Sequence, residues 1–189
     1  MHRGSRVKIL PVFSMIIANG VLATAAQAEE CLAIDSKASE IGFEVLQAGM
    51  PVRGRFERIG GEVCLENETV MRIDAWIAPA SAVTGVADID ATLKQDAFFA
   101  VEKFPRAGFS TDRIETADGE SVVYGRLHVK EVERELAVPF RMQKSADVYT
   151  ARGRFEISRL DFGIGTGEWS DTEWLAENVT VTFSLHASK

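Results

Sequence analysis

Residues 149–187 read YTARGRFEISRLDFGIGTGEWSDTEWLAENVTVTFSLHA, and two runs in this stretch alternate strictly between apolar and polar side chains. In the first run, one phase holds Tyr149, Ala151, Gly153, Phe155 and Ile157. In the second run, the equivalent phase holds Val179, Val181, Phe183, Leu185 and Ala187. A period of two predicts β-strands with one face on an apolar core and the other in water. The stretch therefore predicts two strands joined by a long loop.

The loop, residues 158–178, contains three glycines and two tryptophans, Trp169 and Trp174. Loops of this length inside compact domains are usually functional or disordered, and two large rings argue against disorder. We expect the loop to cover one end of a barrel, with both tryptophans as plugs. The Gly-x-Gly-x-Gly run is not a dinucleotide fingerprint, because that motif needs a strand before it and a helix after it.

Turn residues and apolar alternation predict further strands along the chain. They fall at residues 31–35, 41–45, 52–56, 62–66, 71–77, 108–114, 121–129 and 136–142. Residues 81–99 lack period two, and the spacing of Ile89, Leu93 and Ala97 predicts one short helix at about residues 88–96. Evenly spaced strands with a single apolar face are typical of a sandwich or a closed barrel.

Many positions that we expect to face inward are small. They are Gly42, Gly54, Ala75, Gly125, Ala151 and Gly153. A core that is filled only by side chains is densely packed, whereas eight-stranded barrels can hold one small ligand. These positions favour a hollow interior.

The N-terminus is typical of an export signal. Arg3, Arg6 and Lys8 precede an apolar run of about 14 residues, which is shorter than the about 20 residues of a spanning helix. Cleavage after Ala28 would leave one domain, residues 29–189. Export favours a disulfide between Cys31 and Cys64, and two buried free thiols are the alternative.

Charge and composition exclude several functions. The chain has 21 Lys and Arg against 28 Asp and Glu, a net charge of −7, so we expect no nucleic-acid partner. Beyond residue 28 the histidines are His128 and His186, and both lie on polar phases. We find no nucleophile beside a base and no cluster of metal ligands, so we expect neither an enzyme nor a metal site.

The most specific motif is Arg159-x-Asp161-Phe-Gly163-Ile-Gly165-x-Gly167-x-Trp169. Weaker motifs precede it in order: Asp35 with Ser39-x-Ile41-x-Phe43, Val52-Arg-Gly54-Arg-Phe56, Asp90-x-x-Leu93, Phe98-Phe99, Phe104-Pro105 and Gly125-Arg-Leu127. With these motifs the chain resembles the YceI-like family of exported lipid-binding proteins. The resemblance implies an all-β fold, namely an antiparallel eight-stranded lipocalin-like barrel with a short helical insertion. Ala38 and Ala91 depart from the family, whose members often carry His at these places.

The resemblance also implies a function. The chain would be a periplasmic carrier that encloses a long apolar lipid, such as a polyprenyl lipid or a ubiquinone-like quinone, with no cofactor required. Two alternatives stay open, namely an interaction partner of a membrane-bound b-type cytochrome and an enzyme acting on a lipid or quinone. A homodimer also stays open.

The residues that we expect to bind the ligand are Phe43, Phe56, Ile73, Leu93, Phe98, Phe99, Leu127, Leu136, Phe140, Phe155, Phe162, Ile164, Trp169 and Phe183. Two expectations concern charged groups. Asp90 is a candidate for meeting the ligand's polar head, and Arg159 is expected to pair with Asp161 and hold the glycine loop.

Overall fold

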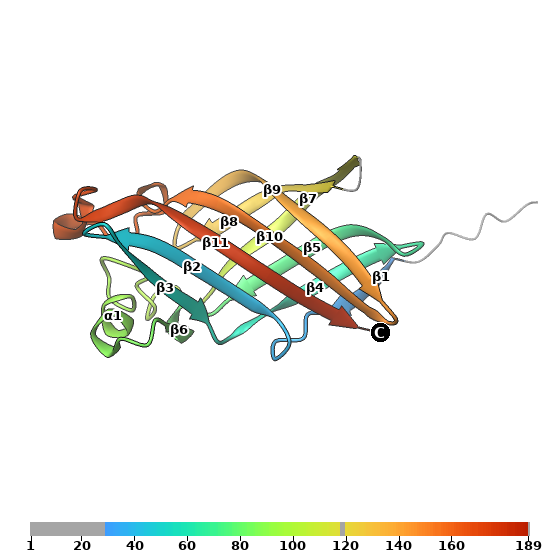
Figure 1. The fold of residues 1–189 in the computed structure, drawn as a ribbon, viewed down its shortest axis with the longest axis horizontal. Helices are drawn as coiled ribbons and strands as arrows, with labels where there is room; N and C mark the ends of the chain where they lie inside the picture. The colour runs from blue at the N-terminus through green and yellow to red at the C-terminus, as the bar shows by residue number, and fades with distance from the viewer. Residues whose placement is uncertain (1–28, 118–119, 189) are drawn as a thin grey trace, which may run out of the picture.

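The computed structural model describes residues 29–117 and 120–188, which form one antiparallel sheet of 11 strands (Figure 1). The strands are β1 (Glu30–Ala33), β2 (Glu40–Gln47), β3 (Met50–Phe56), β4 (Ile59–Glu66), β5 (Thr69–Ile77), β6 (Ala82–Val83), β7 (Ala107–Ala117), β8 (Glu120–Val129), β9 (Val132–Ser145), β10 (Val148–Ser158) and β11 (Leu175–Ser188). Their order in the sheet is β1-β4-β5-β7-β8-β9-β10-β11-β2-β3-β6. The predicted signal peptide lies outside the described residues.

The sheet coils into a barrel because β1 reaches two other strands. It pairs with β4, and Ile34, just after it, forms a bridge to Ala187 of β11. Two hydrogen bonds hold this seam: the Ile34 N–H donates to the Gly61 carbonyl at 3.0 Å, and the Asp35 N–H donates to the His186 carbonyl at 2.8 Å. The all-β antiparallel prediction is confirmed.

The predicted count of eight strands is wrong. Eight is the count that the resemblance implies, whereas turn residues and alternation predict ten of the eleven strands, β1 among them. The strand that they miss is the two-residue β6, which is too short to show a period of two.

A disulfide joins Cys31 of β1 to Cys64 of β4, as predicted, with the two Cα atoms 4.0 Å apart. The bond lies on the outer face beside Arg72, whose Nη2 donates to Cys64 Sγ at 2.9 Å. It covalently ties the first strand to the sheet near the seam.

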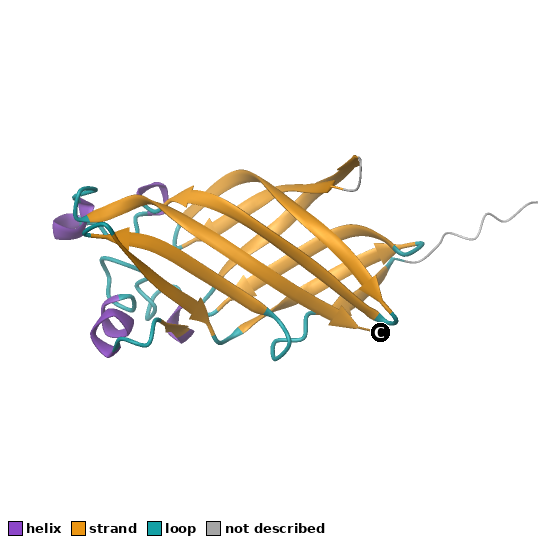
Figure 2. Cartoon of the chain, in the orientation of Figure 1, coloured by secondary structure: helices purple, strands orange, loops and turns teal. Residues whose placement is uncertain are grey.

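Helical turns gather at one end of the sheet (Figure 2). They are η1 (Pro79–Ser81), α1 (Ala87–Thr92), η2 (Leu160–Phe162) and η3 (Gly167–Ser170). The helix α1 ends four residues before its predicted end. The chain turns there instead, since the Phe99 N–H bonds the Leu93 carbonyl at 3.1 Å and carries Phe98 and Phe99 inward. Within the described ranges no helix is long and apolar enough to cross a membrane.

The opposite end of the barrel is filled by a packed core. Its buried members are Leu32, Ile34, Val63, Leu65, Ile73, Val123, Val138, Phe140, Tyr149, Ala151, Leu185 and Ala187. The alternation of residues 71–77 puts Met71 on the same, inward phase as Ile73 and Ile77, yet Met71 is 46% exposed. The register between β4 and β5 shifts there, because Cys64 pairs with Arg72 while Leu65 pairs with Val70. This bulge reverses the phase, so Val70 packs against the core in place of Met71.

The pairing of β5 with β7 is short. It covers Ala75–Ile77 on β5 and ends at Phe109 on β7. Two residues further along β7, the side chain of Thr111 takes the place of the missing backbone hydrogen bonds between the two strands. The Thr111 hydroxyl accepts from the Ile73 N–H at 3.0 Å and donates to the Ile73 carbonyl at 2.6 Å, while the Thr111 N–H donates to Asp74 Oδ1 at 2.7 Å.

Removal of this hydroxyl should loosen the β5–β7 seam. Thr111→Val keeps the shape but leaves two backbone groups of Ile73 without partners, so we expect the free energy of unfolding in urea to fall by about 1–2 kcal/mol. Thr111→Ser keeps the hydroxyl and is the control. Equal stability of Thr111→Val and the wild type would show that the hydroxyl does not hold the seam.

Candidate functional site

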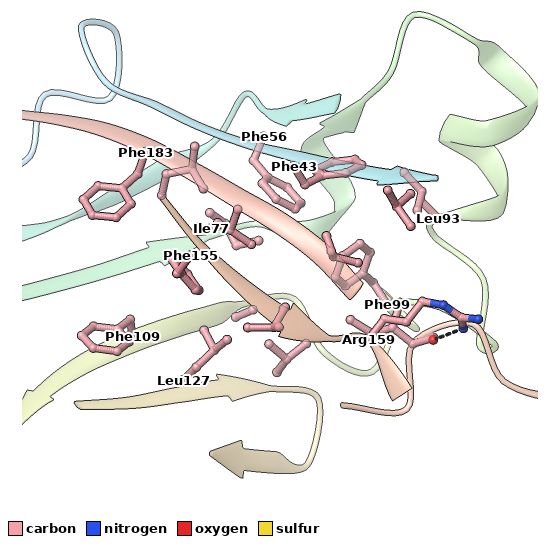
Figure 3. Close-up of a pocket in the computed structure, with 18 of the residues that line it drawn as sticks. Phe43, Phe56, Ile77, Leu93, Phe99, Phe109, Leu127, Phe155, Arg159 and Phe183 are labelled. Carbon is pink, nitrogen blue, oxygen red and sulfur yellow. Dashed lines mark hydrogen bonds between the residues drawn. The ribbon is translucent and has the colours of Figure 1, made fainter. Parts of the chain in front are cut away.

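A cavity of about 370 Å³ lies inside the barrel, between the packed core and the helical turns. Its volume lies within the range of about 300–1,000 Å³ that is usual for ligand pockets. Side chains from strands on several sides of the barrel point into it (Figure 3).

The wall of the cavity is almost entirely apolar. Amide, hydroxyl or charged side chains come from Gln47, Asp88, Thr92 and Arg159 among the described residues. Asp88 is exposed, and Gln47 and Thr92 are half-buried, whereas Arg159 is buried. The cavity therefore opens between the end of β2 and α1, and we call this opening the mouth.

The hollow interior is visible in the burial of its aromatic rings, because large rings that point inward are not fully buried. Phe43, Phe155 and Phe183 line the cavity and remain half-buried in the folded chain. In a filled core such rings would be closely packed by neighbours on all sides.

The rings stay at the wall because each lies over a glycine of a neighbouring strand. Phe43 covers Gly54, and Phe183 covers Gly153, directly across in the register. A Cβ added at either glycine would lie less than 3.0 Å from a ring carbon. A third ring, Phe109, lies over Gly125 in the same way. The glycines thus make space behind the rings and leave the centre of the barrel empty.

One of the small residues that we expected to face inward does not. Gly42 lies on the outer face of β2, where an added Cβ would meet the exposed Thr182 hydroxyl at 3.2 Å. Its phase is opposite to that of its neighbours Ile41 and Phe43, which line the cavity.

A methyl group at Gly54 should push a ring into the cavity. We expect Gly54→Ala to lower the free energy of unfolding by about 1–3 kcal/mol through overpacking. The displaced ring should also reduce the volume of the cavity, and with it the size of ligand that fits. The double variant Gly54→Ala with Phe43→Leu removes the ring and should regain stability. If Gly54→Ala alone leaves the free energy of unfolding unchanged, the position of the Phe43 ring does not depend on that glycine.

Arg159 organises the loop that covers the helical end. Its side chain is 1% exposed, and all five of its N–H groups donate to backbone carbonyls. The acceptors, at 2.7 to 3.0 Å, are the carbonyls of Ile164, Gly165, Trp169, Leu175 and Ala176. Burial lowers the pKa of the guanidinium, and the charge of Glu177 opposes this shift. The predicted pair with Asp161 is wrong, because carbonyl groups take every donor.

The same loop contacts the helical insertion and the turn between β8 and β9. The Gly165 N–H donates to the Ala97 carbonyl at 2.7 Å, and Lys130 Nζ donates to the Gly163 carbonyl at 2.8 Å. The rings of Trp169 and Phe98 meet edge to face with centroids 5.4 Å apart. Trp169 lines the cavity as expected, whereas Trp174 is 51% exposed and is not a plug.

Replacement of Arg159 should release the loop. Arg159→Lys keeps the charge but offers three donors for five carbonyls, so we expect a loss of at least about 2 kcal/mol in the free energy of unfolding and faster proteolysis within residues 158–178. The exposed Arg152→Lys is the control. Unchanged stability and proteolysis in Arg159→Lys would contradict this role.

Twelve of the fourteen residues that we expect to bind ligand lie in the cavity wall. They are Phe43, Phe56, Ile73, Leu93, Phe98, Phe99, Leu127, Phe140, Phe155, Ile164, Trp169 and Phe183. The other two lie elsewhere: Leu136 packs against the core at the closed end, and Phe162 packs near Ala107 and Val129. Contact of the twelve with a ligand stays a prediction.

Several wall residues were not among those fourteen. They include Ile41, Val45, Ile77, Ile89, Phe109, Ile157, Val179 and Val181. Most share the phase of a predicted inward residue, so the alternation itself could have identified them. Asp90, by contrast, does not line the cavity. Its Oδ1 accepts from the Thr84 N–H and hydroxyl at 2.6 and 2.7 Å, which lowers the pKa of its carboxyl group.

A model of the YceI-like domain matches residues 32–187 of the sequence. The chain belongs to the YceI-like family. No curated protein matches it.

Solved structures share the barrel of this YceI-like chain. Burkholderia cenocepacia BcnA superposes with a TM-score of 0.78 at 25% identity, over 82% of this chain and 99% of that one. A polyisoprenoid-binding domain from Saccharophagus degradans gives 0.69 at 17% identity, over 82% and 97%. The Campylobacter jejuni YceI protein gives 0.67 at 21% identity, over 73% and 85%.

Proposed function

We propose that the protein binds one long apolar lipid, a polyisoprenoid or a quinone-like molecule, in its barrel and carries it without chemical change. The observation that carries this proposal is the hollow apolar cavity, in which inward rings such as Phe155 and Phe183 remain half-buried. The fold likeness to the Saccharophagus degradans polyisoprenoid-binding domain supports this ligand class.

Burial alone can hold such a ligand. Each CH₂ group taken from water contributes about 0.8 kcal/mol, so several isoprene units bind tightly without polar contacts. The wall has its accessible polar groups at the mouth, where Gln47, Asp88 and Thr92 lie. The ligand's hydrocarbon chain would fill the interior and its polar head would lie at the mouth.

The charged side chains of the cavity wall favour a carrier over an enzyme. Of its two charged side chains, Arg159 has all five donors engaged by carbonyls, and Asp88 lies exposed at the mouth. Neither is a general acid or base held beside the centre of the cavity.

The proposed compartment is the periplasm. The N-terminal signal motif supports export, and the disulfide between Cys31 and Cys64 supports an oxidising compartment. A lipid that crosses this aqueous space needs a carrier to shield it.

Native mass spectrometry of the exported protein, followed by organic extraction, tests the ligand class. We expect one bound polyprenyl or quinone species per chain. A protein that stays empty after incubation with a total membrane lipid extract would contradict the proposal.

A single large side chain in the wall should block the ligand. Val181 lies in the wall on β11, and Thr182, its neighbour, is exposed on the outer face. We expect Val181→Trp to lower the affinity for geranylgeraniol at least tenfold because the indole fills the cavity. Thr182→Trp is the matched control and should bind like the wild type. Equal binding by both variants would place the ligand outside the cavity.

A further inference from the structure

Exposed large hydrophobic side chains of the described residues are not evenly spread. Six are more than a third exposed: Leu46 (46%), Met50 (69%), Met71 (46%), Val86 (51%), Val148 (37%) and Trp174 (51%). Met71 and Val148 begin or adjoin the hairpins β4–β5 and β9–β10. The other four belong to the β2–β3 hairpin and to the segments just before α1 and β11, and these segments lie at the end of the barrel that carries the mouth (Figure 1).

Each of these four residues adjoins the cavity wall in sequence. Leu46 lies between Val45 and Gln47, and Trp174 precedes Leu175; all three of these neighbours line the cavity. Met50 pairs with the wall residue Gln47 across the β2–β3 hairpin. Val86 directly precedes α1, whose Asp88 and Ile89 line the cavity. We call Leu46, Met50, Val86 and Trp174 the mouth rim.

Two of the three segments that carry the mouth rim are joined by a hydrogen bond. The Ala48 N–H in the β2–β3 turn donates to the Trp174 carbonyl at 2.7 Å, which joins the hairpin to the glycine loop. Met50 shares its strand phase with Val52 of the wall. Apolar side chains therefore stand beside the polar groups of the mouth, at the point where the cavity opens to the outside.

We propose that the mouth rim docks on the surface of a lipid bilayer, so that the ligand passes between membrane and cavity without crossing water. This inference rests on the proposed function, because the ligand class is one that resides in membranes. Trp and other large apolar side chains are the groups that enter a membrane interface, and the rim presents them beside the mouth of the cavity.

A membrane fits the rim better than a second protein does. Four side chains from three separate segments cover much less than the about 800 Å² per partner of a stable protein interface.

The charge of the rim also indicates which kind of bilayer it fits. Exposed acidic residues, Asp88, Asp171 and Glu173, lie in the same segments, and the chain carries a net charge of −7. Like charges repel, so the rim suits a zwitterionic surface and not an anionic one.

Flotation with phosphatidylcholine vesicles tests the docking. We expect the wild type to float with the vesicles and its tryptophan fluorescence to be quenched by brominated phosphatidylcholine. Trp174→Ser should weaken partitioning about tenfold, and Leu46→Ser with Met50→Ser should weaken it at least as much. Met71→Ser and Val148→Ser remove exposed apolar side chains that lie away from the mouth, and both variants should partition like the wild type. Replacement of half of the lipid by phosphatidylglycerol should weaken binding.

The outcomes separate this inference from the proposed function. Val181→Trp, which should not bind geranylgeraniol, keeps the mouth rim and should still float. Rim variants should bind geranylgeraniol in buffer without vesicles as the wild type does. The docking proposal is overturned if the wild type does not float, if the rim variants float like the wild type, or if the Met71 and Val148 variants lose as much. It is also overturned if ultracentrifugation shows a dimer that the rim variants abolish, since the rim would then bind a second copy.

Discussion

The covered end of this barrel depends on one buried guanidinium. A buried cation is costly unless its donors are satisfied, and Arg159 can satisfy five only if the loop wraps around it and turns its carbonyls inward. That wrapping places Ile164, Trp169 and Leu175 on the cavity wall. Gly163 and Gly165 take left-handed dihedrals that let the chain turn tightly enough. The cavity wall at this end is therefore a consequence of a polar requirement.

The hollow centre has a different origin, in steric pairing between strands. An aromatic residue facing a glycine can lie flat against the sheet, while the same residue facing a larger neighbour would stand into the interior. Phe43 with Gly54 and Phe183 with Gly153 follow this rule on separate strand pairs. The pairing explains how a chain rich in inward phenylalanines keeps an empty space and still buries much of each ring.

The alternation of residues 179–187 was enough to predict a strand and its inward face, and alternation did the same for much of the barrel. The disulfide followed from the export motif and the pair of cysteines. The predictions that were wrong concern contacts between one segment of the chain and another. The period of one strand does not reveal a bulge against its partner, so Met71 was placed on the wrong face. The acceptors of Arg159 are backbone carbonyls, which every residue carries, so its sequence neighbour Asp161 was the apparent partner. Trp174 is exposed, and the hairpin binds its backbone carbonyl, a contact that its residue type does not reveal.

The packed core at the far end makes the cavity a tube that is closed on that side. A linear molecule can thread such a tube in one direction only. For the proposed ligand the hydrocarbon tail must lead on the way in, and the head must lead on the way out. Under the proposed function, each molecule would therefore be handed over head first, and the acceptor would meet its functional group before its chain. The closed end of the barrel would thus set the orientation in which a bound lipid leaves.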